Sequence, residues 1–328
     1  MSEYLGIDVG SVSTNLCVLS GDGEVLESLY LETRGRPIEA VSQGLAMLAH
    51  RGFHIAGVGT TGSGRYLARA LVGGDVCKNE ITAHAVAALH EEPDVHTIIE
   101  IGGQDSKIII IRNGVVVDFA MNTVCAAGTG SFLDRQAARL GVPIERFGEL
   151  AGSAREPVRI AGRCAVFAES DMIHKQQVGH PVESIVKGLC EALVRNYLNN
   201  VGKGKDIREI VMFQGGVACN SGMVSAFEEA LGMKVRVPPH CRVMGAIGAA
   251  LLAKKAVRGV STRFRGFDVA MKECRTETFA CTACANRCEV VKLLINQEKA
   301  GFWGGRCGRW EHAGSGRGQD FPAVGSMV

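Results

Sequence analysis

The chain has 328 residues and a formal net charge of +2, with 46% apolar and 21% charged residues. Such a composition is ordinary for a globular protein, and the balanced charge gives no general argument for binding nucleic acid or a membrane. No run approaches the roughly 18 apolar residues that a spanning helix needs, and the amino terminus lacks the basic and apolar parts of a signal peptide. We therefore expect a cytoplasmic protein, long enough for two or more domains.

The first 30 residues predict three strands joined by glycine-containing turns. The first strand ends in the loop Asp8-Val9-Gly10-Ser11, and the chain turns back again at Gly21-Asp22-Gly23. The same order recurs from Ile98, where an apolar strand leads into Gly102-Gly103 and a second strand turns back at Asn113-Gly114, a strong hairpin signal. This internal repeat predicts two similar subdomains that face one another across a cleft.

Helical and strand patterns alternate along the rest of the chain, which indicates an α/β class. The subdomains are expected at 1–92 and 93–258, with the last helix, about 243–255, packing back on the first. A small Cys-rich extension, 259–311, and a disordered Gly/Ser-rich tail, 312–328, are expected to follow. The predicted helices are 37–50, 66–71, 83–90, 132–140, 181–199, 221–231 and 245–253, and further strands are expected at 55–59, 210–213 and 235–237.

Three glycine loops, at 6–11, 101–107 and 213–220, each follow an apolar strand. Without a Cβ in the way, the backbone N–H groups of such loops can approach phosphate. Asp8 and Asp105 are placed to hold Mg²⁺ directly or through water. One loop alone would be only a tight turn, but three in this order indicate a nucleotide site. The residues expected at the nucleotide are Gly10, Ser11, Val12, Thr14, Gly102, Gly103, Lys107, Gly128, Gly130, Gly215, Gly216 and Asn220.

Two cysteines, Cys125 and Cys164, each stand ahead of a predicted helix. A helix amino terminus favours a thiolate and stabilises an anionic cluster. An iron–sulfur cube normally takes four cysteines, so a twofold dimer with one pair per subunit would complete a bridging cluster. The alternative is two buried structural thiols.

Seven sequence strings together resemble one family over roughly residues 4–255: GIDVGSVST, TGSGR, NEITAHA, IIEIGGQDSK, NTVCAAGTGSFLD, GRCAVFAESD and FQGGVACN. They are similar to the activator ATPases of 2-hydroxyacyl-CoA dehydratases and the benzoyl-CoA reductase ATPase subunits (the BadF/BadG/BcrA/BcrD type). That family lies within the actin–sugar kinase–Hsp70 superfamily. The resemblance implies duplicated ribonuclease H-like, actin-like ATPase subdomains.

The resemblance also implies an activity. A homodimer would share one [4Fe–4S] cluster and couple hydrolysis of Mg²⁺-bound ATP to ADP with one-electron transfer. The electron would come from reduced ferredoxin or flavodoxin and pass to an iron–sulfur acyl-CoA dehydratase or reductase. Gln104 is a candidate for orienting the attacking water, beside Asp8 and Asp105. The alternatives are a small-molecule kinase on the same fold, with Asp8 or Asp105 as base, and a nucleotide-dependent binding module.

Five of the twelve cysteines lie between residues 274 and 307. The spacing of Cys281, Cys284 and Cys288, with Cys307 downstream, is a metal-ligand pattern of moderate strength. It predicts a second iron–sulfur cluster or Zn²⁺, with the absence of any metal as the third alternative.

Overall fold

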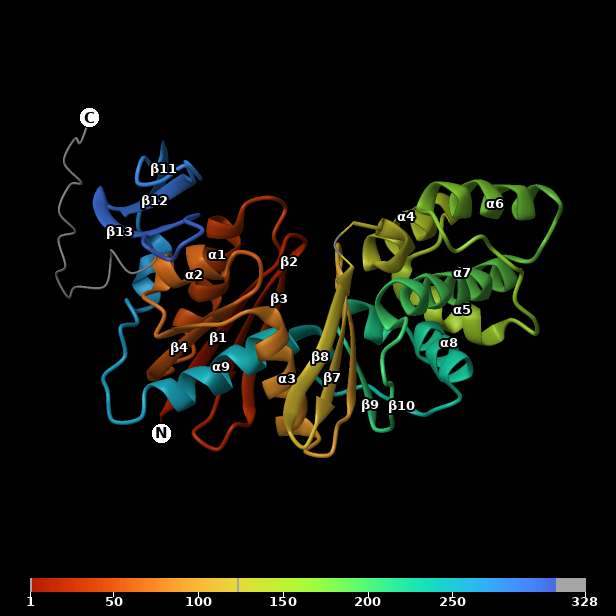
Figure 1. Ribbon diagram of the computed structural model, residues 1–328, viewed down its shortest axis with the longest axis horizontal. Coiled ribbons are helices and arrows are strands. Elements are labelled where there is room, and N and C mark those ends of the chain that lie inside the picture. The colour runs from red at the N-terminus through yellow and green to blue at the C-terminus, as the bar shows by residue number, and fades with distance from the viewer. Residues whose placement is uncertain (1, 123, 311–328) are drawn as a thin grey trace. The chain divides into compact units, whose positions relative to one another are not determined.

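The computed structural model describes residues 2–122 and 124–310, which form two compact units (Figure 1). The first unit comprises residues up to Ala83 and from Gly245 onward, and the second runs from His84 to Met244. The boundary between the units was expected after residue 92. In the structure it lies within helix α3 (Glu80–Glu91). The tail expected to be disordered, 312–328, lies outside the described residues.

Each unit contains a five-stranded sheet, and the two sheets have the same topology. The first has the order β3-β2-β1-β4-β5 and the second β8-β7-β6-β9-β10. In both, an antiparallel three-stranded meander receives two further strands in parallel. This confirms the internal repeat and the duplicated α/β fold. The strands are β1 (Glu3–Val9), β2 (Ser13–Leu19), β3 (Val25–Glu32), β4 (Ile55–Thr61), β5 (Val76–Cys77), β6 (Thr97–Ile101), β7 (Ser106–Arg112), β8 (Val115–Asn122), β9 (Val211–Gln214) and β10 (Val235–Arg236).

In the first unit, α1 (Pro37–Ala49) and α2 (Arg65–Val72) pack on a core built from β1, β2 and β4. Helix α9 (Met244–Ala256) lies directly against the strand backbones. A Cβ added to Gly6 would stand 1.8 Å from the Ala246 carbonyl oxygen, and one added to Gly59 would stand 1.9 Å from that of Ala249. The small residues on both sides therefore allow this close approach.

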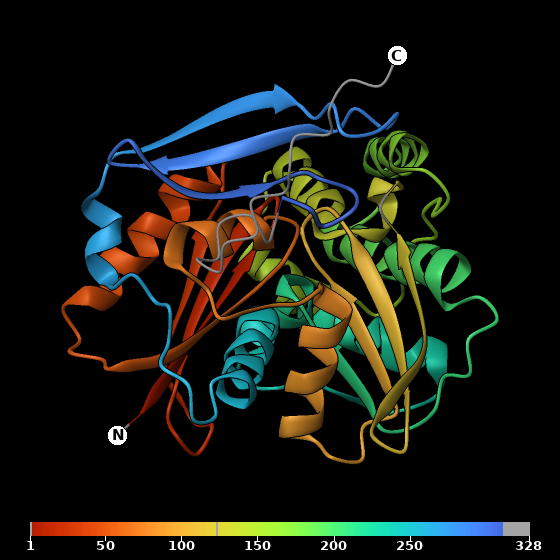
Figure 2. The same ribbon diagram turned by 60° about the vertical axis from the view of Figure 1, so that its left-hand side comes forward.

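The carboxy-terminal extension is an antiparallel sheet of β11 (Cys274–Ala280), β12 (Glu289–Ile295) and β13 (Glu298–Trp303). Its strands run past α1 and α2 of the same unit (Figure 2), and Leu293 is buried in that unit's core. The extension was expected from its composition. Its strands were not, because the apolar alternation along them is weak.

In the second unit, helices cover one face of the sheet, and Tyr197, Phe213 and Phe227 meet edge to face in the core. The side chain of Asn220 accepts a hydrogen bond from Met223 N–H and so caps the last of these helices. No helix in residues 2–122 or 124–310 is both long and apolar enough to cross a membrane. The helices are α4 (Gly130–Leu140), α5 (Phe147–Ser153), α6 (Ala165–Gln177), α7 (Val182–Tyr197) and α8 (Ser221–Leu231).

Candidate functional site

In the first unit, the loop after β1 packs against the loop after β4. Gly10 N–H donates to the Ser13 carbonyl at 2.8 Å, and Gly64 N–H donates to the Val9 carbonyl at 2.8 Å. Gly62 has a φ of +90°, and a Cβ there would lie 2.5 Å from Asp8 Oδ1. Since β1 and β4 are parallel neighbours, their carboxyl ends bring Asp8 and the TGSGR string to one edge of the sheet.

Thr14 and Ser11 differ in their surroundings. The side chain of Thr14 is fully buried, and its hydroxyl lies 2.9 Å from Thr33 Oγ1, which donates to the Gly10 carbonyl. Thr14 thus supports Gly10 through Thr33, and its expected place at the nucleotide stays a prediction. Ser11 is exposed at the loop itself.

In the second unit, a buried lysine joins two carboxylates. Lys107 Nζ lies 2.9 Å from Glu100 and 2.9 Å from Asp105, and only 2% of its side chain is exposed. A phosphate-facing role for Lys107 stays a prediction, while the structure shows it holding the half-exposed Asp105 in place. Gln104, beside it, is exposed.

The strand register also refines the internal repeat. Asp8 pairs with Asn15 across β1 and β2, and Glu100 pairs with Lys107 across β6 and β7. Glu100 is therefore the counterpart of Asp8, whereas Asp105 belongs to the turn before β7. Glu100 was missed by the sequence analysis, although a carboxylate inside the apolar run IIEI was the available signal.

The third glycine loop closes over the end of β6. Gly215 has a φ of +89°, and a Cβ there would lie 2.3 Å from the Ile101 carbonyl oxygen, so only glycine fits. Gly216 is exposed. At the end of the loop, Asn220 Nδ2 is buried and has no hydrogen-bond partner in the described chain. A buried donor without a partner fits a loop that receives a polar ligand.

Helix α4 starts directly on the second glycine loop. Gly130 N–H donates to the Gly102 carbonyl at 2.8 Å, and Ser131 N–H donates to the Gly103 carbonyl at 2.9 Å. The added Cβ of Gly130 would stand 3.0 Å from Gly102 O, so the contact is tight. The first turn of α4 is therefore hydrogen-bonded directly to the 102–103 loop.

Cys125 lies just ahead of this helix, in a loop clamped by an asparagine. Cys125 N–H donates to Asn122 Oδ1 at 2.9 Å, and Asn122 Nδ2 donates to the Cys125 carbonyl at 2.8 Å. A short 3-10 helix, η1 (Ala126–Gly128), begins directly after Cys125 and separates it from α4. The Cys125 Sγ lies 3.7 Å from Asn196 Nδ2.

Cys164 is the residue that directly precedes α6. The two cysteine loops are joined: Asn196 Nδ2 also donates to the Gly162 carbonyl at 2.6 Å, and Cys125 Sγ lies 4.0 Å from the Arg163 carbonyl. Both thiols are free and partly exposed. Asn122 and Asn196 were missed, because nothing in the sequence links residue 196 to residue 125.

The surface beside these thiols is apolar. Val124 is 95% exposed, Phe167 69% and Val166 67%. Three large apolar side chains next to two free thiols mark a surface suited to further contact.

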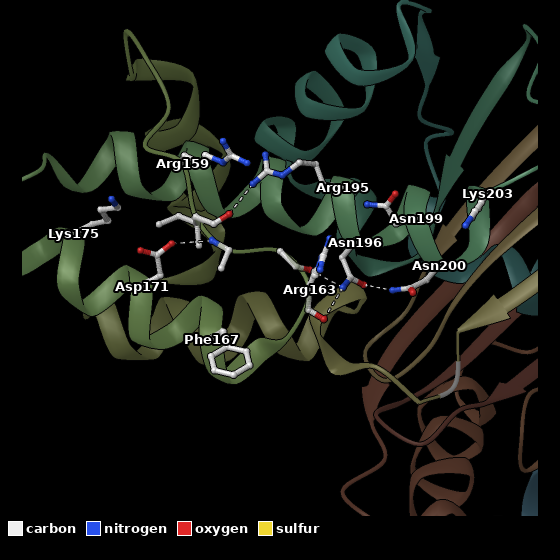
Figure 3. Close-up of a pocket in the computed structure, with 13 residues that line it drawn as sticks. Arg159, Arg163, Phe167, Asp171, Lys175, Arg195, Asn196, Asn199, Asn200 and Lys203 are labelled. Atoms are coloured by element: carbon white, nitrogen blue, oxygen red, sulfur yellow. Dashed lines mark hydrogen bonds between the residues drawn. The ribbon is translucent and has the colours of Figure 1, made fainter.

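A cavity of about 1060 Å³ adjoins the cysteine loops (Figure 3). Its lining carries five cationic side chains and one carboxylate, Asp171, which accepts a hydrogen bond from Ala161 N–H. Arg195 pairs with Glu191, while the other cations have no carboxylate partner in the described residues. The cavity wall therefore carries an excess of positive charge. The five cations are Arg159, Arg163, Lys175, Arg195 and Lys203.

The carboxy-terminal cysteines lie around the β11–β12 hairpin. Cys281 N–H donates to the Cys288 carbonyl at 2.8 Å, which closes the loop that holds Cys284. Cys307 follows β13 and is exposed. Within residues 2–122 and 124–310, no three His, Cys, Asp or Glu side chains form a group ready to hold a metal ion. The second metal site thus stays a prediction.

Comparison with known proteins gives consistent matches. The family model described as the BadF/BadG/BcrA/BcrD ATPase family matches residues 5–253. The (R)-2-hydroxyglutaryl-CoA dehydratase activating ATPase of Acidaminococcus fermentans is 37% identical, over 79% of this chain and 100% of that protein.

Two solved structures extend the comparison. The crystal structure of component A of the A. fermentans (R)-2-hydroxyglutaryl-CoA dehydratase has a TM-score of 0.73 at 33% identity, and the match covers 79% of this chain and all of that one. The activator of the 2-hydroxyisocaproyl-CoA dehydratase from Clostridium difficile, with bound ADPNP, has a TM-score of 0.69 at 31% identity, covering 77% and 94%.

Proposed function

Because the chain belongs to the BadF/BadG/BcrA/BcrD ATPase family, we propose that it is an ATP-driven electron-transfer activator. It is an ATPase, and hydrolysis would accompany the passage of one electron to a partner iron–sulfur enzyme of the acyl-CoA dehydratase or reductase type. The names of its relatives, which activate 2-hydroxyacyl-CoA dehydratases, support this partner class. Reduced ferredoxin or flavodoxin would supply the electron.

The glycine loops would bind ATP or ADP. The backbone donors of the 8–11 and 102–105 loops suit phosphate, and the free Nδ2 of Asn220 suits a polar group of the nucleoside. Asp8 and Asp105 would hold Mg²⁺, whose preferred ligands are oxygens. Gln104, exposed beside Asp105, would orient the water that attacks the terminal phosphate.

Cys125 and Cys164 would hold a [4Fe–4S] cluster. The free thiols, the hydrogen bond that joins their loops and the neighbouring cations fit this anionic group. When bound, such a cluster takes up and releases one electron at low potential. Two thiols per chain would leave the cluster half ligated, so a homodimer would supply all four, and exposed Val124, Val166 and Phe167 offer apolar surface for the second copy.

The proposal extends to a second metal, a cluster or Zn²⁺, at the carboxy-terminal cysteines. Cys281, Cys284 and Cys288 share one hairpin loop, and Cys307 lies on the chain after the adjoining strand. A loop with ligands spaced this closely can gather around an ion that it does not hold in advance.

One observation supports a structural link between nucleotide binding and the position of Cys125. The first residues of α4 take their backbone acceptors from Gly102 and Gly103, and Cys125 stands on the same short connection. The 102–103 loop cannot change its carbonyl directions upon phosphate binding without breaking these hydrogen bonds or moving α4. Asn196 then transmits the shift from the Cys125 loop to the Cys164 loop.

Gly130→Val tests this path. The new side chain would press on Gly102 O and Val217 Cγ2, which lie 3.0 and 3.1 Å from the Cβ position, and would force α4 from the loop. We expect iron to be retained but ATP-driven electron transfer to fall about tenfold or more, since a displacement of ~1 Å can cost on the order of 100-fold. Iron content and ATP-dependent reduction of an acceptor are measured together.

The matched control is Gly152→Val on α5, where an added Cβ meets nothing within 4 Å. It should behave as the wild type. If Gly130→Val also transfers electrons at the wild-type rate while holding its iron, the α4 connection does not carry the coupling.

A further inference from the structure

A second pair of thiols connects the 215–220 glycine loop to the short helix that follows β10. These thiols are separate from Cys125 and Cys164, which we propose as the cluster ligands. Cys219 ends the short helix η4 (Gly216–Cys219), and Cys241 begins η5 (Cys241–Val243). Their Sγ atoms are 3.3 Å apart, and Arg242 Nε donates to Cys219 Sγ at 3.1 Å. Cys219 is exposed, whereas Cys241 is buried.

This arrangement makes the two sulfurs unequal. The hydrogen bond from the Cys241 thiol, together with the Arg242 guanidinium, lowers the pKa of Cys219 to about 6. The pKa of Cys241 is raised, because its thiol donates to the neighbouring sulfur and is buried. At neutral pH, Cys219 is thus the thiolate and Cys241 keeps its proton. Burial raises the pKa of Cys17 to about 12, and burial together with the Glu191 carboxylate raises the pKa of Cys190 to about 12, so those thiols are unreactive.

We propose that Cys219 and Cys241 form a reversible redox site that reacts with peroxides and closes to a disulfide. Cys219 is the residue that reacts with the peroxide, because it is the exposed member and Arg242 holds its sulfur. Cys241 is the resolving residue, because its sulfur already lies in contact with that of Cys219.

The chemistry balances with a hydroperoxide as oxidant. The Cys219 thiolate attacks one peroxide oxygen, an S–O bond forms, the O–O bond breaks, and the leaving alkoxide takes a proton to give an alcohol, or water from hydrogen peroxide. Cys241 sulfur then attacks Cys219 sulfur, so that the S–S bond forms and the S–O bond breaks. The departing hydroxide takes the Cys241 proton and leaves as water. A dithiol reductant reverses the oxidation by exchange.

A disulfide between Cys219 and Cys241 would restrain the 215–220 loop. Gly215 N–H donates to the Cys241 carbonyl at 2.9 Å, and Asn220 directly follows Cys219. Cys241 already holds Gly215, at the start of the 215–220 loop, through this hydrogen bond. A disulfide would also join Cys241 to Cys219, near the end of the loop. The loop would then be fixed at both ends, and its freedom to adjust would be lost.

Tryptic peptide mapping tests the proposal on the full holoprotein. Cleavage after lysine and arginine places Cys219 alone in peptide 209–234 and Cys241 alone in peptide 237–242. Anoxically purified protein is treated with one equivalent of hydrogen peroxide, blocked with N-ethylmaleimide and digested without reduction. We expect the two peptides joined and lighter by two hydrogens than their sum, and separate again after dithiothreitol. Cys190, alone in peptide 188–195, should remain a thiol.

Single variants separate the two roles. In Cys241→Ser, Cys219 should accumulate as a sulfenic acid that dimedone traps, whereas in Cys219→Ser, Cys241 should give no such adduct. The rate of Cys219 alkylation should be half-maximal near pH 6. The proposal is overturned if the wild type gives no joined peptide, or if Cys241 is trapped as readily as Cys219. Because the readout comes from these peptides alone, it does not depend on the fate of the cluster.

Discussion

Cys125→Ser is expected to lose nearly all of the cluster iron, and the dimer with it. The Cys125 sulfur would be one of the two ligands that each chain provides, and serine is a poor ligand for the soft iron–sulfur core. We expect the iron of the bridging cluster, about four atoms per two chains for one [4Fe–4S] cluster, to fall to about a tenth of that or less. Iron and sulfide analysis and the mass in solution are measured on anoxically purified protein.

The matched control is the double variant Cys281→Ser/Cys284→Ser, which removes two cysteines far along the chain from Cys125. It should keep the bridging cluster and the dimer, while any zinc or second cluster is lost. Loss of all iron in this variant would instead place the cluster at the carboxy-terminal set. If neither the wild type nor Cys125→Ser holds iron and ATP is still consumed, the result contradicts the electron-transfer function. It would then favour the small-molecule kinase.

Asp105→Asn is expected to lower the rate of ATP hydrolysis by about 100-fold or more while leaving iron content unchanged. The loss of a carboxylate that holds a metal ion or moves a proton commonly has an effect of this order. The fold should survive, because Lys107 keeps its second partner, Glu100, at 2.9 Å. Steady-state phosphate release at saturating Mg²⁺ and ATP measures the effect.

Asp206→Asn serves as the control, since this carboxylate is on the surface and pairs with Arg112 and Arg208. Hydrogen bonds from Arg208 and Arg112 hold the pKa of Asp206 below its usual range, so this carboxylate is ionised. Asp206 is also not part of any of the three glycine loops. Its ATPase rate should match the wild type. Equal rates in Asp105→Asn and Asp206→Asn would remove Asp105 from the catalytic assignment.

Much of the fold could be predicted because its signals are local. Apolar runs that end in glycine predict the core strands, and α8 begins at Ser221 and ends at Leu231 as expected. Its asparagine cap and its terminal glycine, Gly232, are close in sequence to the residues they affect. The repeated order of strand, turn and strand then leads to the same sheet topology in both units.

The site could be predicted less well from the sequence, because its geometry depends on residues that are far apart along the chain. The bonds from Asn196 to the Cys125 loop span 71 residues, and no local pattern indicates them. The equivalence of Asp8 and Glu100 appears only once the strand register is known. Likewise, Cys219 and Cys241 are 22 residues apart, and their contact follows from how η4 and η5 meet.

Weak patterns account for the missed elements. Helix α5 covers only 7 residues and has no side-chain cap, so its sequence resembles a loop. The end of helix α6 at Gln177 could not be predicted, because one face of the helix stays exposed and gives little apolar periodicity. The strands of the carboxy-terminal sheet are largely exposed on one side, which leaves the same ambiguity.

The most direct measurement is the EPR spectrum of the reduced wild-type protein, recorded with MgADP and again with a non-hydrolysable ATP analogue. The account predicts a reducible bridging cluster, one per two chains. Its spectrum should change between the two nucleotides, because the 102–103 loop would move α4 and the Cys125 loop. A cluster whose spectrum is the same with both nucleotides would contradict the coupling. A reduced protein without any cluster signal would contradict the electron-transfer function itself.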